Sequence, residues 1–123
     1  MTRLEACFIA NATVLCTHQI DAAFWHEWDL FHIPGGNQMN LLLNLPILAS
    51  VFVAFWHVVS RSSHARFGHL YLVSLGVLTV LIHAVFFALG YPEFRQTVSV
   101  GLIAAAGILS ILQLTLVMGA ERE

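Results

Sequence analysis

Charged residues are scarce in this chain of 123 residues, because Asp, Glu, Lys and Arg together make up only 10% of it. A soluble domain usually carries about 25%. The five basic residues are all arginine, they form no run, and the net charge is −2. These counts exclude a nucleic-acid-binding protein and a polybasic protein of the membrane surface. The hydrophobic share of 59% also excludes an intrinsically disordered chain.

Cysteine is rare too, and the two cysteines present cannot bridge each other. Cys7 and Cys16 lie in the same apolar stretch. On one helix they would be about 13 Å apart along the axis, whereas a disulfide tolerates about 7 Å between Cα atoms. The sequence therefore predicts two unpaired cysteines that serve as small packing residues.

Continuous apolar sequence is what the chain has in abundance. The apolar stretches are each close to the roughly 20 residues that a helix needs to cross about 30 Å of hydrocarbon. Strands of a membrane β-barrel would instead alternate apolar and polar residues. The sequence predicts an all-α fold in which residues 1–123 form one integral membrane domain. It is a four-helix transmembrane bundle with spans at about 6–25, 39–59, 69–90 and 97–118.

The arginine residues predict the orientation of this bundle. With four spans, both termini lie on the same side of the membrane as the middle loop. That side carries Arg3, Arg61, Arg66 and Arg122, whereas the other side carries only Arg95. Because basic residues are retained on the cytoplasmic side, we expect the N- and C-termini to be cytoplasmic.

Several polar side chains lie inside the predicted spans, where insertion scales put an ionisable group at about 2.5–3.5 kcal/mol. Such groups must face the bundle interior and find partners. At 100° per residue, one face of the first span carries Asn11, His18 and Asp21. Asn40 and Asn44 share a face of the second span, and His83 is the deep ionisable group of the third. At about 1.5 Å per residue these side chains fall in one layer of the outer half.

This layer predicts a polar pocket that can hold a metal ion. Imidazole and carboxylate groups are ligands of zinc and non-haem iron, and three such ligands leave a position open for water or substrate. We expect His18 and His83 to be ligands, with Asp21 as a third ligand or as the carboxylate that orients a histidine. Other residues would surround the ion: His26 as a further ligand, Asn40 and Asn44 as donors behind the ligands, and Glu27 as general acid/base. The chemistry would be hydrolysis or oxidation of a lipid-phase substrate.

Other interpretations of the same residues remain open. The pocket can be a buried hydrogen-bond network that gives the bundle one register, a proton relay, or a site for a small polar ligand. Haem or pigment could bind through His18 with His83, or through His57 with His69. An acidic pocket rich in Asn differs from an apolar porphyrin slot, which disfavours haem.

The pattern of residues resembles a family of small bacterial four-helix membrane proteins of unknown function, whose hallmark is His-Glu-Leu-Asp-Ala followed by His-Glu-Trp. The matching segments are His18-Gln19-Ile20-Asp21-Ala22, His26-Glu27-Trp28, His83 and Tyr91-Pro92-Glu93-Phe94. Gln19 departs from this pattern, because the family more often has Glu there. A weaker similarity links His18 and Asp21 to HXXEE-domain proteins. The resemblance implies a multi-pass protein of the bacterial cytoplasmic membrane with a site near these residues, and it implies no reaction.

The last predicted span is rich in small residues, which allow helices to approach closely. They either pack inside the bundle or contact a membrane-protein partner or a second copy of the chain. A non-catalytic accessory subunit of a respiratory, photosynthetic or transport complex is therefore the alternative to an enzyme. Apart from such a partner we expect contact only with membrane lipids. The small residues are Gly101, Ala104, Ala105, Ala106, Gly107 and Ser110.

Overall fold

The computed structural model describes residues 1–120, which form five α-helices and no strand. They are α1 (Arg3–Phe24), α2 (Glu27–Leu30), α3 (Gly36–Val59), α4 (Ala65–Ala88) and α5 (Thr97–Gly119). The predicted all-α fold is confirmed for this part of the chain. The four long helices coincide with the apolar stretches, although α1, α3 and α4 begin a few residues earlier than predicted. The short helix α2 was not predicted.

Local sequence signals set the helix boundaries. At the start of α1, the Thr2 hydroxyl accepts a hydrogen bond from the backbone N–H of Glu5, and the Glu5 carboxylate accepts one from the N–H of Thr2. This reciprocal capping satisfies two donors that a helix start leaves unpaired. Before α3, Gly35 has a φ of 105°, which glycine adopts without steric cost. The start of α1 is further joined to the α3–α4 turn by an ion pair between Glu5 and Arg61, at 3.0 Å.

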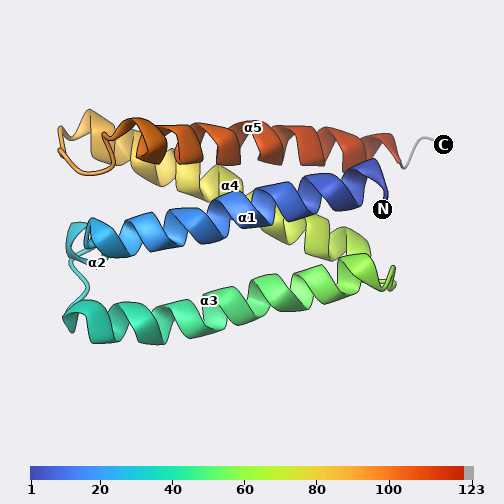
Figure 1. Cartoon of the computed structure of the whole chain (residues 1–123), viewed down its shortest axis with the longest axis horizontal. Coiled ribbons are helices and arrows are strands. Elements are labelled where there is room, and N and C mark those ends of the chain that lie inside the picture. The colour runs from blue at the N-terminus through green and yellow to red at the C-terminus, as the bar shows by residue number, and fades with distance from the viewer. Residues whose placement is uncertain (121–123) are drawn as a thin grey trace.

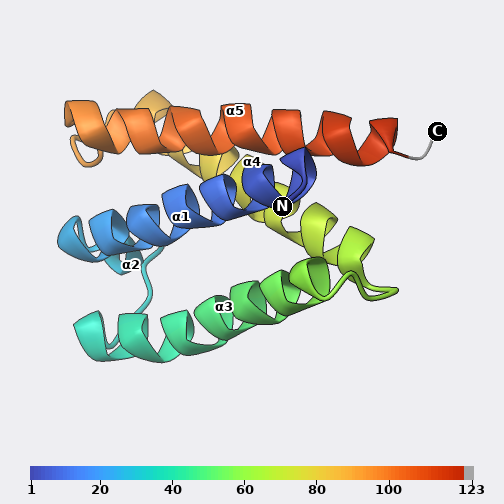
Figure 2. The same cartoon turned by 45° about the vertical axis from the view of Figure 1, so that its right-hand side comes forward.

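The long helices run back and forth along one axis (Figures 1 and 2). Helices α1 and α5 lie side by side, α3 lies on the other side of α1, and α4 crosses behind them obliquely. The start of α1, the end of α5 and the α3–α4 turn are at one end of the molecule. Helix α2 and the α4–α5 loop are at the opposite end, where α2 connects α1 to α3. This end holds the histidines predicted to form a site.

Both the core of the bundle and the outer surface of its helices are apolar. Buried Phe8, Leu72 and Ala106 belong to the main core cluster. On the outside of α3, the large side chains of Phe52 and Trp56 are about two-thirds exposed, at 67% and 66%. Exposed apolar side chains of this size are stable when lipid surrounds them.

Three of the described helices, α3, α4 and α5, are long and apolar enough to cross a membrane, which indicates a membrane protein. Helix α1 falls below this level because Asn11, His18 and Asp21 interrupt its apolar sequence. Four spans and cytoplasmic termini therefore remain predictions. Of the arginines that support this orientation, Arg122 lies outside the described residues.

A buried hydrogen-bond network joins α1, α4 and α5 in the half of the bundle away from α2. The amide nitrogen of Asn11 donates to the Ser110 hydroxyl at 3.1 Å and to the side-chain oxygen of Gln113 at 3.0 Å. The amide nitrogen of Gln113 lies 3.1 Å from Nδ1 of His69. All four side chains are buried. Buried polar groups that find such partners fix how neighbouring helices align.

Helices α4 and α5 are in tight contact at Gly76. A Cβ atom at this position would fall on the Oγ atom of Ser110 and lie 3.1 Å from the carbonyl oxygen of Ala106. Small residues of the last helix thus pack inside the bundle, as one of the two sequence-based interpretations expected. Gly101 and Ala104, by contrast, are exposed on the same helix.

Candidate functional site

His18 of α1 and His83 of α4 meet in the interior, close to α2. Their exposed fractions are 3% and 1%, and their ring centroids are 4.7 Å apart with the rings nearly perpendicular. Both residues lie in apolar helices, so the polar rings turn toward each other and away from the surface. The sequence-based expectation that these two histidines converge is confirmed.

The α4–α5 loop closes the site with an aromatic ring. Phe94 is fully buried, and its ring contacts that of His83 at 4.5 Å and that of His18 at 5.7 Å between centroids. It adopts a left-handed backbone with a φ of 62°. A bulky residue rarely takes this conformation, so surrounding packing must hold it there. Phe94 thereby shields both imidazoles from water, a role that sequence analysis did not anticipate.

A backbone hydrogen bond determines which nitrogen of His83 faces the site. Nδ1 lies 2.8 Å from the carbonyl oxygen of Thr79, one turn earlier in α4. Because a carbonyl only accepts, Nδ1 carries the proton and Nε2 presents its lone pair. Nε2 is buried without a hydrogen-bond partner, and Nδ1 of His18 is too. This arrangement of one ring nitrogen donating to a carbonyl is typical of metal-binding histidines.

Glu27 joins the two histidines because the chain reverses direction just before α2. His26 adopts a left-handed conformation with a φ of 53°, which histidine tolerates better than most residues. Helix α2 then folds back and carries the Glu27 side chain inward, leaving it only 16% exposed. One carboxylate oxygen of Glu27 lies 3.7 Å from Nε2 of His83, which is too long for a hydrogen bond.

The environment of Glu27 disfavours its charge. Burial raises the pKa of this carboxyl from 4.5 to about 7, and the negative charge of Asp21 adds to the rise. Glu27 lies between the long helices, outside the segments that can span a membrane. A cation beside Glu27 would reverse both effects, since an opposite charge favours the ionised form.

Together these residues form a group that can hold a metal ion. Within residues 1–120, one ligand atom from each of His18, Glu27 and His83 lies within 4.8 Å of the others. Two imidazoles and one carboxylate are the protein ligands of many catalytic zinc sites and of non-haem iron(II) oxygenases. Glu27 is therefore placed as a possible ligand, whereas the sequence pattern predicts it as a general acid/base.

The other predicted ligands lie beside this group and not within it. Asp21 is partly buried, one of its carboxylate oxygens has no hydrogen-bond partner, and its charge acts on Glu27. His26 is largely exposed, with Nδ1 3.9 Å from the carboxylate of Asp29 and its ring stacked on Trp28. Asp21 is therefore positioned to act on the site through its charge, whereas the His26 side chain points toward the surface.

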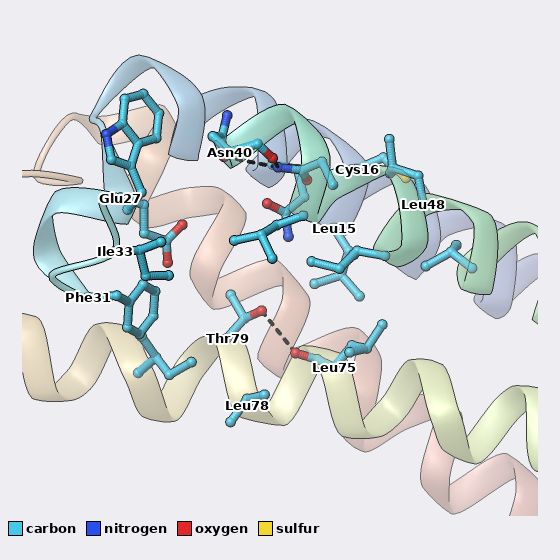
Figure 3. Close-up of a pocket in the computed structure, with 17 residues that line it drawn as sticks. Leu15, Cys16, Glu27, Phe31, Ile33, Asn40, Leu48, Leu75, Leu78 and Thr79 are labelled. Atoms are coloured by element: carbon cyan, nitrogen blue, oxygen red, sulfur yellow. Dashed lines mark hydrogen bonds between the residues drawn. The ribbon is translucent and has the colours of Figure 1, made fainter. Parts of the chain in front are cut away.

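Asn40 and Asn44 face an adjoining cavity of about 280 Å³ between α1, α3 and α4. The side chain of Asn44 donates from Nδ2 to the backbone oxygen of Asn40 at 2.9 Å and to its side-chain oxygen at 3.0 Å. Figure 3 shows the Glu27 carboxylate directed into the space between the helices, with Phe31 and Ile33 beside it. Glu27 thus connects the histidine group to the cavity.

The structure also shows buried polar residues that sequence analysis overlooked. Gln113 and Ser110 are fully buried partners of Asn11, and Gln113 is bonded to His69. The position of Gln113 in the middle of an apolar span indicates a buried polar contact, since such a group must find a partner there. His57 and His69, named above as one possible pair of haem ligands, have different partners. Nδ1 of His57 lies 2.8 Å from the Ser62 hydroxyl, whereas Nδ1 of His69 lies beside the Gln113 amide.

Comparison with known proteins identifies a family but no function. No curated protein and no solved structure matches the chain. Residues 4–120 match a family described as "Family of unknown function (DUF6713)". This match extends over nearly all of the chain and agrees with the expected membership of an uncharacterised family. We conclude that the chain belongs to the DUF6713 family of unknown function.

Proposed function

We propose that this protein is a membrane protein that binds a zinc or iron(II) ion through His18, Glu27 and His83. In this proposal α1 spans the bilayer together with α3, α4 and α5. The termini are on the cytoplasmic side of a bacterial inner membrane, and the metal lies in the outer half of the bundle. The polar face of α1 is compatible with a span, because Asn11 and His18 point into the bundle and are buried.

The observation that carries this proposal is that ligand atoms of His18, Glu27 and His83 lie within 4.8 Å of one another, while each histidine has a buried ring nitrogen without a hydrogen-bond partner. Nε2 of His83 and Nδ1 of His18 are buried without partners, and Glu27 is held nearby although burial disfavours its charge. Buried polar atoms without partners are rare in native structures and call for a specific explanation. A divalent cation would accept the lone pairs of the two histidine nitrogens and would also neutralise the Glu27 carboxylate.

The ligand set favours catalysis over a purely structural metal. Three protein ligands leave coordination positions open, as in catalytic zinc sites, whereas structural zinc sites are usually closed by four. The adjoining cavity gives access to these positions from between the helices. We propose that the metal supports hydrolysis or oxidation of a lipid-phase substrate, with Asp21 accepting a proton beside it.

The contact between the two imidazoles favours a single ion over haem. In a haem with two histidine ligands, the porphyrin plane lies between the rings. The rings of His18 and His83 touch edge to face, with centroids 4.7 Å apart, and leave no gap for such a plane.

Metal analysis of detergent-purified protein tests the proposal. We expect one zinc or iron per chain in the wild type and a loss of that metal in His83→Ala. Two matched variants should keep it. In His69→Ala the lost side chain is a buried histidine of α4 that contacts Gln113, and in His26→Asn the lost side chain is exposed while asparagine retains the left-handed backbone conformation.

Two results would contradict the proposal. One is wild-type protein that contains no metal and takes up none on addition of zinc or iron(II). The other is equal metal loss in His83→Ala and His69→Ala. Metal-free protein that copurifies with larger membrane proteins would instead favour an accessory subunit.

A further inference from the structure

The cavity next to the histidine group has walls that are mainly apolar. Side chains from α1, α3 and α4 surround it, and among these Leu15, Leu48 and Leu75 lie on three different helices. Polar residues occur mainly toward α2, where Glu27 and Asn40 are located (Figure 3). The cavity is therefore amphipathic, with an apolar body and a polar end.

The rim of this cavity lies on the apolar outer surface of the bundle. Three of its lining residues are exposed, namely Phe31 at 44%, Leu43 at 41% and Leu78 at 51%. Leu43 belongs to α3 and Leu78 to α4, both of which are long and apolar enough to cross a membrane. A molecule dissolved in the bilayer can thus reach the cavity between these helices without passing through water.

One hydrogen-bond acceptor at the polar end has no donor in the described residues. Oδ1 of Asn44 is buried without a partner. Its assignment is fixed because the other amide atom faces the backbone oxygen of Asn40, which can only accept, and so must be the nitrogen. The hydroxyl of nearby Thr79 is already used, since it donates to the carbonyl of Leu75 at 2.9 Å. A ligand that donates a hydrogen bond would satisfy Asn44.

Size and charge narrow the class of ligand. At about 280 Å³, the cavity is just below the roughly 300–1,000 Å³ seen for small-molecule sites. That volume suits one alkyl chain and not a two-chain phospholipid. The negative charge of Asp21, which acts on Glu27 at the polar end, disfavours an anionic head group such as that of a fatty acid.

We infer that this cavity binds a single-chain amphiphile with an uncharged, hydrogen-bond-donating head group, such as a long-chain alcohol or primary amide. The chain lies among the leucines of α1, α3 and α4, and the head group donates to Asn44 beside Glu27. Binding of the amphiphile is argued from the cavity alone. That the bound amphiphile is also the substrate of the metal site is a second step, which rests on the proposed function.

Photo-crosslinking in phosphatidylcholine nanodiscs tests this inference. The probe is 1-hexadecanol with a diazirine in the middle of the chain, applied to protein stripped of metal with a chelator. We expect adducts on the lining residues of α1, α3 and α4, mapped by peptide mass spectrometry. Unlabelled 1-hexadecanol should suppress these adducts at concentrations about tenfold lower than hexadecane or hexadecanoate, because one buried hydrogen bond is worth about that factor.

Two leucines of α3 provide a matched pair of variants. Leu48→Trp fills the cavity and should abolish the adducts, whereas Leu45→Trp should leave them unchanged, because Leu45 is 67% exposed and does not line the cavity. Asn44→Leu should remove the preference for the alcohol over hexadecane. His83→Ala should keep the adducts, so that a failure of the metal proposal is distinguished from a failure of this one.

The inference is overturned if adducts are spread over the exposed leucines of the bundle surface, or if Leu45→Trp and Leu48→Trp have equal effects. It is likewise overturned if hexadecane competes as well as hexadecanol against the wild type. The thermal unfolding midpoint of Leu48→Trp should match that of the wild type, which shows that the variant is folded.

Discussion

At the scale of single residues, the surroundings of Glu27 determine how the stability of the protein depends on pH. Glu27 is held in a buried position close to a second carboxylate, so that its protonated form is favoured in the folded protein. A carboxyl whose pKa is raised by folding stabilises the protein when protonated, and this contribution is lost as the pH rises through the pKa of the folded state.

The metal-free wild type should therefore lose stability between about pH 4.5 and about pH 7, where Glu27 is ionised in the unfolded chain but still protonated in the folded protein. The shift from 4.5 to about 7 corresponds to roughly 3 kcal/mol. In Glu27→Gln this part of the pH dependence should be absent. Thermal unfolding of both proteins in detergent, with chelator present, measures the difference.

Zinc should reverse the trend in the wild type, because the metal binds the ionised carboxylate and its binding tightens as the pH rises. In Glu27→Gln, zinc should have little effect at any pH. Identical pH profiles for the two metal-free proteins would show that Glu27 is not held in the environment described.

The residues of the site were predictable to different degrees. His18 and His83 could be identified because an ionisable group inside an apolar helix must face the interior. Helical spacing predicted that Asn40 and Asn44 share one face of their helix. The hydrogen bonds from the Asn44 amide to Asn40 agree with this placement. Glu27 could not be assigned as a ligand, because its position depends on the left-handed conformation of His26, which no periodicity reveals.

At the scale of helices, length and hydropathy were sufficient for the long elements and insufficient for α2. The four long helices follow from apolar runs of about 20 residues. Helix α2 has only four residues, and so it is too short to show a helical period. Its placement arises from tertiary contacts such as the burial of Trp28, which the sequence analysis had not foreseen.

The close approach of α4 and α5 yields a test of helix packing. Gly76→Ala would place a methyl group on the Oγ atom of Ser110, so we expect a loss of about 1–3 kcal/mol from overpacking. Gly101→Ala is the matched control, because a Cβ there meets nothing within 4 Å. Unfolding in detergent should show a lower midpoint for Gly76→Ala alone. Equal midpoints for both variants would mean that the two helices are farther apart than described.

At the scale of the whole molecule, all four long helices run between the same two ends. The start of α1, the α3–α4 turn and the end of α5 are together at one end, and α2 and the α4–α5 loop are at the other (Figure 1). If α1 spans the membrane like its neighbours, the first end faces the cytoplasm and carries Arg3, Arg61 and Arg66.

Cysteine accessibility in intact cells tests this topology. In a background where Cys7 and Cys16 are alanine, an impermeant maleimide should label Gln38→Cys and Gln96→Cys from outside. It should label Ser63→Cys only after lysis. An epitope tag placed before residue 1 should be reached by antibody only after permeabilisation. A tag accessible from outside would show that α1 does not cross, and labelling of Ser63→Cys in intact cells would reverse the orientation.

The order of the proposed metal ligands along the chain has a consequence for how the protein would mature. His18 and Glu27 come from the first third of the sequence, whereas His83 comes from α4. During synthesis, the coordination set is incomplete until α4 has been inserted and has docked against α1. An ion held by all three side chains must then be acquired after assembly, and an N-terminal fragment ending before α4 would be unable to retain it.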